Sequence, residues 1–203
     1  GEAIRPYERS SLFLVSKVMP SNAYGTRLMQ SLDRSLSHLG TDYLDLYLYH
    51  WRGERPLAEM VAAMEGARAA GKIRAWGVSN LDTADMEELW RIDGGRNCAA
   101  NQVLYHMGSR GIDYSLLPWM REHHVALMAY CPLAQVGRLG CDLLGSSVLG
   151  EIAAKYGATP AQIALAWAIR DGNTIAIPRT GRREHAVSNA GADAFDLTVE
   201  DCA

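Results

Sequence analysis

Short strand-forming segments alternate with helical segments along this 203-residue chain, and the alternation restricts the fold more than any other feature. Apolar segments rich in β-branched or aromatic residues predict strands at 12–18, 44–50, 73–80, 99–106, 125–132 and 174–178. Helical patterns lie between them, at 26–40, 56–72, 83–92, 113–123, 146–157 and 159–172. No Asn-Gly or similar hairpin signal joins two of these strands. We therefore predict a parallel sheet with right-handed crossovers.

Two architectures fit this pattern, a doubly wound open sheet and a (β/α)8 barrel. A nucleotide-binding open sheet should carry a Gly-rich phosphate turn after its first strand, and this sequence has none there. The residues able to do chemistry instead stand at the C-terminal ends of the predicted strands: Lys17, His50, Ser79, Asn80, Gln102 and Tyr130. Active sites of (β/α)8 barrels are assembled at that end. The sequence therefore predicts a (β/α)8 barrel, of which these strands supply six of the eight β/α units.

Helices inside the sequence carry capping residues at their ends, whereas both ends of the sequence fall within helical patterns. The helix at 159–172 has Thr159 as N-cap and Gln162 to complete a capping box. By contrast, the chain begins at Gly1, without methionine, in what reads as the end of a helix, and it stops in the first turn of another. We expect residues 1–203 to be a single barrel domain that is incomplete at both ends, with two units missing on the N-terminal side.

Composition argues against several classes of function. The chain is 48% hydrophobic and 21% charged with a net charge of −3, so it has no electrostatic signature of nucleic-acid or anionic-membrane binding. Neither a membrane-spanning apolar run nor a leader is visible, and we expect a cytoplasmic protein. The four cysteines lack metal-ligand spacing, so reduced thiols and no metal site are expected.

Lys17 and His50 each have an ordinary explanation as well as a functional one. Lys17 shares a strand face with Phe13 and Val15, so it lies either at a strand edge, with its ammonium group in water, or in a site. His50 shares a face with apolar residues and is either a hydrogen-bonded core histidine or a functional group. Both occupy matching ends of neighbouring predicted strands, which favours a shared site.

Polar side chains also end the next strands. Ser79 and Asn80 precede a helix, where turn and cap residues are common. Gln102 lies within an apolar strand, and its amide must find hydrogen-bond partners there. Together these three residues suggest a site that binds a carboxamide, with the flat ring of Tyr130 beside it.

Seven stretches of the chain resemble the aldo-keto reductase family, in the family's order and at its spacing. They are "LFLVSKV", "SLDRSLSHLGTDYLDLYLYHW", "GKIRAWGVSNL", "NQVLYH", "AYCPLAQ", "KYGATPAQIALAWAI" and "IAIPRT…H…N". The resemblance covers almost the whole chain, from the family's third strand nearly to its end. It implies a (β/α)8 barrel that reduces aldehydes and ketones with NAD(P)H.

The resemblance assigns catalytic roles to two residues. Lys17 matches the lysine that lowers the pKa of the family's proton-donating tyrosine, and His50 matches the histidine that orients the carbonyl. Trp51 and Met19 match positions at the substrate mouth. In the family, the donor tyrosine and the aspartate that holds the lysine would precede Gly1. We therefore expect the 203 residues alone to be inactive.

The resemblance also assigns cofactor contacts. It places Ser79, Asn80 and Gln102 at the nicotinamide carboxamide and Tyr130 against the nicotinamide ring. It also assigns cofactor contacts to Pro132 and Leu133. The adenosine end is assigned to Arg179, Thr180, His185 and Asn189. His185 stands where arginine is usual, and Ser188 where an acidic residue is usual. Arg182 and Arg183 could compensate, so NADPH is the expected cofactor, with NADH as the alternative. A solvated basic helix start is the competing interpretation of this segment.

Two functions of different kind therefore remain open. One is an NADPH-dependent carbonyl reductase, monomeric when intact, that acts on a small-molecule aldehyde or ketone. The other is a catalytically incompetent NADPH-binding relative that acts as a sensor or partner subunit. A phosphosugar enzyme on the same fold is disfavoured, because no Gly-rich phosphate loop follows the last predicted strand.

Overall fold

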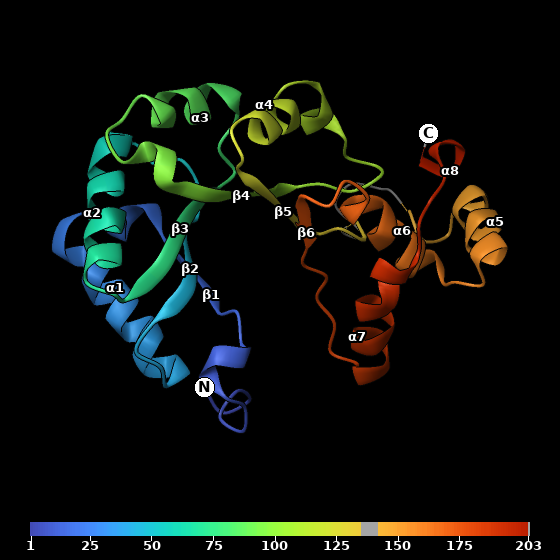
Figure 1. The fold of residues 1–203 in the computed structure, drawn as a ribbon, viewed down its shortest axis with the longest axis horizontal. Helices are drawn as coiled ribbons and strands as arrows, with labels where there is room; N and C mark the ends of the chain where they lie inside the picture. Colours follow the sequence, from blue (N-terminus) through green and yellow to red (C-terminus); the bar gives the residue numbers. More distant parts are fainter. Residues whose placement is uncertain (135–141, 203) are drawn as a thin grey trace. The chain divides into compact units, whose positions relative to one another are not determined.

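The computed structural model describes residues 1–134 and 142–202, and the chain divides into two compact units, Gly1–Asn101 and Gln102–Ala203 (Figure 1). All six predicted strands are present, and hydrogen-bonded strands are neighbours in chain order. β4 (Cys98–Leu104) crosses the boundary between the units. Gln135 of the "AYCPLAQ" motif and Cys141 lie outside the described residues.

The first unit contains three β/α repeats and the beginning of β4. Its elements are η1 (Arg9–Ser11), β1 (Val15–Val18), η2 (Pro20–Asn22), α1 (Gly25–Leu39), β2 (Leu44–Tyr49), α2 (Leu57–Ala69), β3 (Ile73–Ser79), α3 (Thr83–Trp90) and η3 (Gly95–Asn97). β1 pairs with β2 and β2 pairs with β3, both in parallel. Lys17 lies opposite Leu48, and Leu48 lies opposite Gly77. The predicted parallel connections are therefore confirmed in this unit.

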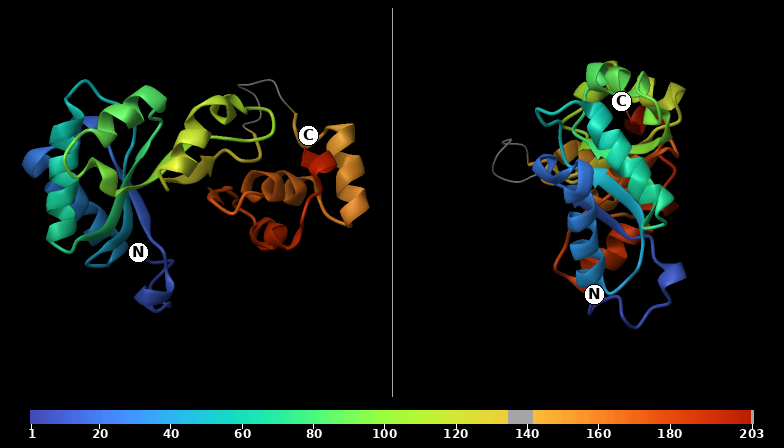
Figure 2. Two further views of the ribbon diagram at one scale, coloured as in Figure 1. Left: turned by 45° about the horizontal axis from the view of Figure 1, so that its top comes forward. Right: turned by 90° about the vertical axis from the view of Figure 1, so that its left-hand side faces the viewer.

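The core of the first unit lies between its strands and the helices α1 and α2, which cover the same face (Figure 1 and Figure 2). Every residue of β2 is buried, because the strand has neighbours on both edges. From α1, Leu28, Leu32 and Leu36 are buried at a spacing of four, which is the spacing of one helix face. The amphipathic pattern in the sequence thus corresponds to a real packing face.

The second unit continues with the rest of β4 and two further strands. Its elements are η4 (Gly111–Tyr114), α4 (Leu116–Glu122), β5 (Ala126–Tyr130), α5 (Ser147–Tyr156), α6 (Pro160–Ile169), β6 (Thr174–Ala176), α7 (Arg183–Ala190), η5 (Gly191–Ala194) and α8 (Val199–Cys202). β5 and β6 pair in parallel. The predicted capping box of α6 is confirmed, since Gln162 N donates to Thr159 Oγ1 and Thr159 N donates to Gln162 Oε1. None of the described helices is long and apolar enough to cross a membrane.

The observed strands are shorter than the predicted ones. The predicted strand at 12–18 begins only at Val15. Before it, Leu14 N donates to a side chain, Asp45 Oδ2, rather than to a strand neighbour. Strand β6 ends at Ala176, two residues before Pro178, which has no N–H to donate. Apolar composition therefore identified the strands, but local hydrogen bonding sets their ends.

A buried carboxylate, Asp45, organises the N-terminal ends of these strands. Its side chain is only 3% exposed. Oδ2 accepts from Arg9 Nη2 and from Leu14 N, each at 2.8 Å, and Oδ1 accepts from Arg74 Nη1 at 3.1 Å. The guanidinium groups of Arg9 and Arg74 also lie over the Tyr43 ring, 3.8 and 4.3 Å from its centre. Residues before β1 and residues of β2 and β3 thus meet at one anion.

These contacts lower the pKa of Asp45. Burial by itself would raise it, but the hydrogen bond from Leu14 N, the hydrogen bond and charge of Arg9 and the charge of Arg74 outweigh burial. The folded-state pKa therefore lies below its ordinary value of 3.8. A depressed carboxyl pKa means that the stabilisation is present above the unfolded-state value and is lost as pH falls through the folded-state value.

We predict that Asp45→Asn lowers the free energy of unfolding by about 2–3 kcal/mol near neutral pH, because it leaves two arginines without their anion. The difference between variant and wild type should shrink as pH falls below about 4. The matched control is Asp33→Asn, which removes an exposed ion pair with Lys72 and should cost about 0–1 kcal/mol. Urea denaturation at several pH values measures both, and equal losses for the two variants would contradict the assignment.

Candidate functional site

Lys17 and His50 lie at the C-terminal ends of neighbouring parallel strands. Lys17 is the third residue of β1 and is exposed, whereas His50 directly follows β2 and is half-buried. His50 N donates to Val18 O at 3.1 Å, which continues the pairing of the two strands by one residue. Parallel strands present their carboxyl ends on the same edge, so both side chains belong to one end of the unit.

The pKa of His50 depends on its burial and on the charge of Lys17. Burial lowers the pKa of His50 below its ordinary value of 6.5, and the positive charge of Lys17 lowers it further. Both effects favour the neutral imidazole. At neutral pH the ring can therefore donate one hydrogen bond from a nitrogen to a substrate oxygen without carrying a charge.

Two large apolar side chains flank this pair. The Trp51 ring lies 4.7 Å from the His50 ring, centre to centre, at an angle of 48°. Met19 follows β1, and both Trp51 and Met19 are about two-fifths exposed, at 40% and 45%. Exposed apolar side chains beside a polar pair are typical of a small-molecule binding site.

Ser79 and Asn80 end the third strand of the same unit. Ser79 is buried as the last residue of β3, and Asn80 adopts a left-handed backbone conformation with φ of 58°. Asparagine tolerates this conformation better than most residues. Asn80 Nδ2 lies within hydrogen-bonding distance of Ser79 Oγ, at 3.2 Å, and of His50 O, at 3.3 Å. The amide therefore connects the end of β3 to the end of β2.

In the second unit, Gln102 and Tyr130 occupy neighbouring strands β4 and β5. Gln102 is buried, and its Nε2 donates to the thioether sulfur of Met128, a weak acceptor. Met128 lies two residues before Tyr130 on β5. Since side chains two residues apart point to the same side of a strand, both lie on one face of β5. Burial, and less strongly Cys131, raises the pKa of Tyr130 above 10.0, so this phenol stays protonated at neutral pH.

The segment that follows Tyr130 turns sharply. Cys131 and Ala134 have positive φ values of 50° and 62°, which is uncommon for residues other than glycine. Between them Pro132 is buried and Leu133 half-buried. The apolar pair therefore lies directly beyond the phenol at the end of β5.

Beyond β6, a basic segment leads into α7. Arg179 is exposed and Thr180 is half-buried, and Thr180 Oγ1 accepts from Arg182 N at 3.1 Å. His185 is exposed on α7. Asn189, near the end of α7, lines a cavity of about 400 Å³ together with residues of β6 and η5. Exposed cations next to a helix N-terminus suit an anionic group.

The predicted residues are divided between the two units. The first unit holds Lys17, Met19, His50, Trp51, Ser79 and Asn80 at the C-terminal ends of β1, β2 and β3. The second holds Gln102, Tyr130, Pro132, Leu133, Arg179, Thr180, His185 and Asn189. Sequence reasoning did not single out Met128 or Arg52. Met128 lies two residues before Tyr130 on the same strand, and this spacing was the signal that could have identified it. For Arg52, the signal was its position directly after Trp51.

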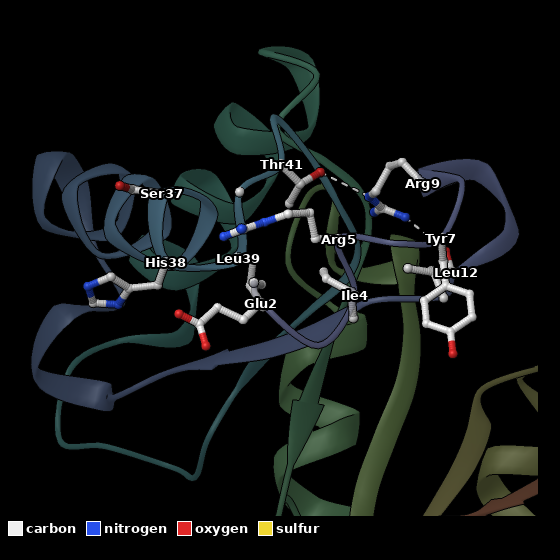
Figure 3. Close-up of a pocket in the computed structure, with 12 residues that line it drawn as sticks. Glu2, Ile4, Arg5, Tyr7, Arg9, Leu12, Ser37, His38, Leu39 and Thr41 are labelled. Atoms are coloured by element: carbon white, nitrogen blue, oxygen red, sulfur yellow. Dashed lines mark hydrogen bonds between the residues drawn. The ribbon is translucent and has the colours of Figure 1, made fainter.

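The first unit has a cavity near the N-terminal ends of β1 and β2, opposite the end that carries Lys17. It has a volume of about 430 Å³ and is lined by the N-terminal residues and the end of α1, including Arg5, Leu12, His38 and Thr41 (Figure 3). Leu12 precedes β1 and Thr41 precedes β2. This cavity is therefore remote from Lys17, which stands at the opposite end of β1, and it is not part of the candidate site.

The three described cysteines are free thiols. Cys98 is buried, which raises the pKa of its thiol to about 12, so it stays protonated. Cys131 and Cys202 are free and half-buried. In residues 1–134 and 142–202, no three His, Cys, Asp or Glu side chains are grouped as a metal site.

Comparison with known proteins identifies a family. The sequence model of the Aldo/keto reductase family matches residues 1–203. Methylglyoxal reductase YeaE of Escherichia coli is 50% identical over 203 residues, which are 100% of this chain and 71% of that protein. Glyoxal reductase of Bacillus subtilis is 34% identical over 193 residues, which are 95% and 67% of the two chains. The crystal structure of a Klebsiella pneumoniae aldo/keto reductase in complex with NADP and acetate is 52% identical with a TM-score of 0.95, over 98% of this chain and 70% of that one.

The electrostatic coupling of Lys17 and His50 gives a direct prediction. In Lys17→Met, the pKa of His50 should rise toward 6.5 yet stay below it, because burial remains. Proton NMR titration of the histidine ring signals measures this shift. His106, whose pKa burial alone lowers, is the internal control and should not move. An unchanged His50 pKa in the variant would show that the two side chains do not interact.

Proposed function

Because the chain belongs to the aldo/keto reductase family, we propose that the protein reduces the carbonyl group of small aldehydes or ketones to an alcohol with NADPH. The observation that carries the proposal is the position of Lys17 and His50 at the same ends of neighbouring parallel strands, where burial and, less strongly, the lysine charge lower the pKa of His50. Relatives named as methylglyoxal and glyoxal reductases favour small dicarbonyl compounds as the first substrates to test.

Within this proposal, residues 1–203 contribute six consecutive β/α units to one (β/α)8 barrel domain. The alternation of strands and helices and the parallel pairing within each unit support it. The position of the polar residues at the C-terminal strand ends also fits, because such barrels carry their active sites there. A cytoplasmic monomer stays a prediction from sequence.

The catalytic step needs charge stabilisation on the carbonyl oxygen. Bound NADPH would supply the hydride, and His50 would donate a hydrogen bond to the oxygen that gains negative charge. Lys17 would lower the pKa of a tyrosine that protonates this oxygen, since a nearby cation favours the phenolate. Trp51 and Met19 would contact the substrate on its apolar side.

The proton donor itself is not identified among these residues. None of the nine tyrosines of the sequence lies in the family's donor motif, and Tyr130 matches a cofactor contact. We therefore propose that turnover belongs to the intact protein and that the 203 residues alone lack it. The same observation favours the second candidate, an NADPH-binding relative without turnover. Carbonyl reduction by the intact protein decides between the two.

The polar residues at the strand ends fit the nicotinamide carboxamide of NADPH. A carboxamide offers both an N–H donor and a C=O acceptor, and each of Ser79, Asn80 and Gln102 has a hydroxyl or amide group able to bond it, as the motif of the family implies. Ser79 and Gln102 are both buried. Tyr130 would stack on the ring, with Pro132 and Leu133 beside it.

The basic segment after β6 fits the adenosine 2′-phosphate. Arg179, Thr180 and His185 would contact the phosphate, and Asn189 the adenine, as the motif of the family implies. Arginine forms bidentate hydrogen bonds with phosphate oxygens, and this supports a preference for NADPH over NADH.

The preference for NADPH can be measured by fluorescence titration of the intact protein. We predict tighter binding of NADPH than of NADH, and a loss of about 1–3 kcal/mol in NADPH binding for Arg179→Ala, since one charge-assisted contact is removed. NADH affinity should change little and serves as the control. Equal affinities for both cofactors, or unchanged NADPH affinity in the variant, would contradict the assignment.

The role of His50 can be separated from a structural one. In the intact protein, His50→Ala should lower the rate of carbonyl reduction about 10²–10³-fold, because a hydrogen bond to the developing oxyanion is lost. NADPH affinity should stay near the wild-type value. Stopped-flow measurement of NADPH oxidation, together with thermal melting, provides both readouts. A lower melting temperature with unchanged turnover per folded molecule would identify His50 as a core residue instead.

A further inference from the structure

Arg52, directly after Trp51, joins the β2–α2 loop to helix α3, which follows β3. Its Nε donates to Asp85 Oδ1 at 3.3 Å, and its Nη2 donates to both oxygens of Glu88 at 3.2 and 3.3 Å. Asp85 and Glu88 belong to α3, the helix that follows β3. One guanidinium group therefore bridges the β2–α2 loop to the next β/α repeat.

The same guanidinium group also holds its own loop. Its Nη1 donates to Arg55 O at 2.8 Å and to Gly53 O at 3.3 Å. The guanidinium group of Arg52 thus donates both to two backbone carbonyls of its own loop and to the carboxylates of Asp85 and Glu88. Arginine can do this because its N–H groups diverge in a fixed plane.

Gly53 shows how closely this loop is packed. Its N–H donates to the hydroxyl oxygen of Tyr49, the last residue of β2, at 2.7 Å. A Cβ atom at position 53 would lie 2.7 Å from Pro20 Cβ and 2.8 Å from Tyr49 Oη, closer than real Cβ contacts. Only glycine fits without a shift, so the loop lies directly against η2, the turn that follows Met19.

Trp51 and His50 are therefore held from several directions. Arg52 fixes the loop on the C-terminal side of Trp51, and the Asn80 amide lies near His50 O on its other side. The Trp51 ring in turn contacts the His50 ring. A displacement of the loop would move the apolar wall of the site relative to the imidazole.

We propose that Arg52 is a positioning residue, which fixes Trp51 beside His50 by clamping the β2–α2 loop to α3. The inference rests on the proposed function of His50 and Trp51. Arg52, Asp85 and Glu88 are 30%, 25% and 48% exposed, so solvent screens their charges and the ion pairs add little to global stability. The contribution of Arg52 lies in geometry, because misplacing a reacting group by about 1 Å can cost about 10²-fold in rate.

The test compares Arg52→Met with Arg52→Lys in the intact protein, using methylglyoxal as the carbonyl probe. Arg52→Met should lower kcat/KM about 10- to 100-fold, while the NADPH dissociation constant stays within about twofold. Arg52→Lys should recover only part of the loss, because an ammonium group cannot bridge both carboxylates and both carbonyls in one plane. Asp85→Asn combined with Glu88→Gln should reproduce the loss and add little to Arg52→Met.

Arg55→Met is the matched control. Arg55 lies in the same loop and is exposed, but its side chain pairs with Glu59 on the following helix and lies over Tyr24. This variant should keep wild-type kcat/KM. Wild-type kinetics in Arg52→Met, or an equal loss in Arg55→Met, would overturn the inference. So would a lower melting temperature with unchanged turnover per folded molecule.

A failure of the proposed function gives a different result. If the wild-type protein reduces no carbonyl compound, the function is wrong, whatever Arg52 does. Hydrogen exchange at the Gly53 amide then still tests the clamp, because it reports on the loop without substrate. Faster exchange in Arg52→Met than in Arg55→Met supports the clamp, and equal exchange contradicts it.

Discussion

The buried carboxylate of Asp45 is the interaction on which the first unit depends. It collects Arg9, Arg74 and the amide of Leu14 at the N-terminal ends of β1, β2 and β3. The contact with Leu14 N lies one residue before β1, so it fixes the register in which β1 enters the sheet. A slip of one residue would move Lys17 to the other face of the strand. The Asp45 contact and the backbone pairing of β1 with β2 thus hold the same register, which places Lys17 opposite Leu48.

The N-terminal and C-terminal strand ends of the first unit therefore carry different kinds of residues. The Asp45 end is closed by charged hydrogen bonds, and the cavity beside it in Figure 3 contains none of the proposed catalytic side chains. The opposite end carries Lys17 on β1, His50 directly after β2 and Trp51 one residue further into the loop. Strands hold side chains more rigidly than loops do, which explains why the loop residue needs the additional support of Arg52.

Some elements followed directly from the sequence, and others did not. The capping box of α6 was predicted correctly, because its two hydrogen bonds join Thr159 and Gln162, which lie three residues apart. The strand at 12–18 was predicted three residues too long, because its start depends on a carboxylate 31 residues away in the chain. Lys17 and His50 could be selected as a pair because they occupy matching ends of neighbouring predicted strands and match the family motif. Met128 and Arg52 were not singled out, because their contacts with Gln102 and with α3 join residues far apart in the sequence.

The sequence by itself determined the alternation of strands and helices, the helix caps and the set of polar residues at the strand ends. These features depend on periodicity and on neighbours a few residues apart, which one chain displays directly. The motifs also carried the family resemblance that the comparisons then confirmed. Only the tertiary structure decided the strand register, the depressed pKa of His50 and the clamp made by Arg52. Each of these arises from groups far apart in sequence, whose distance and solvent exposure exist only once the chain has packed.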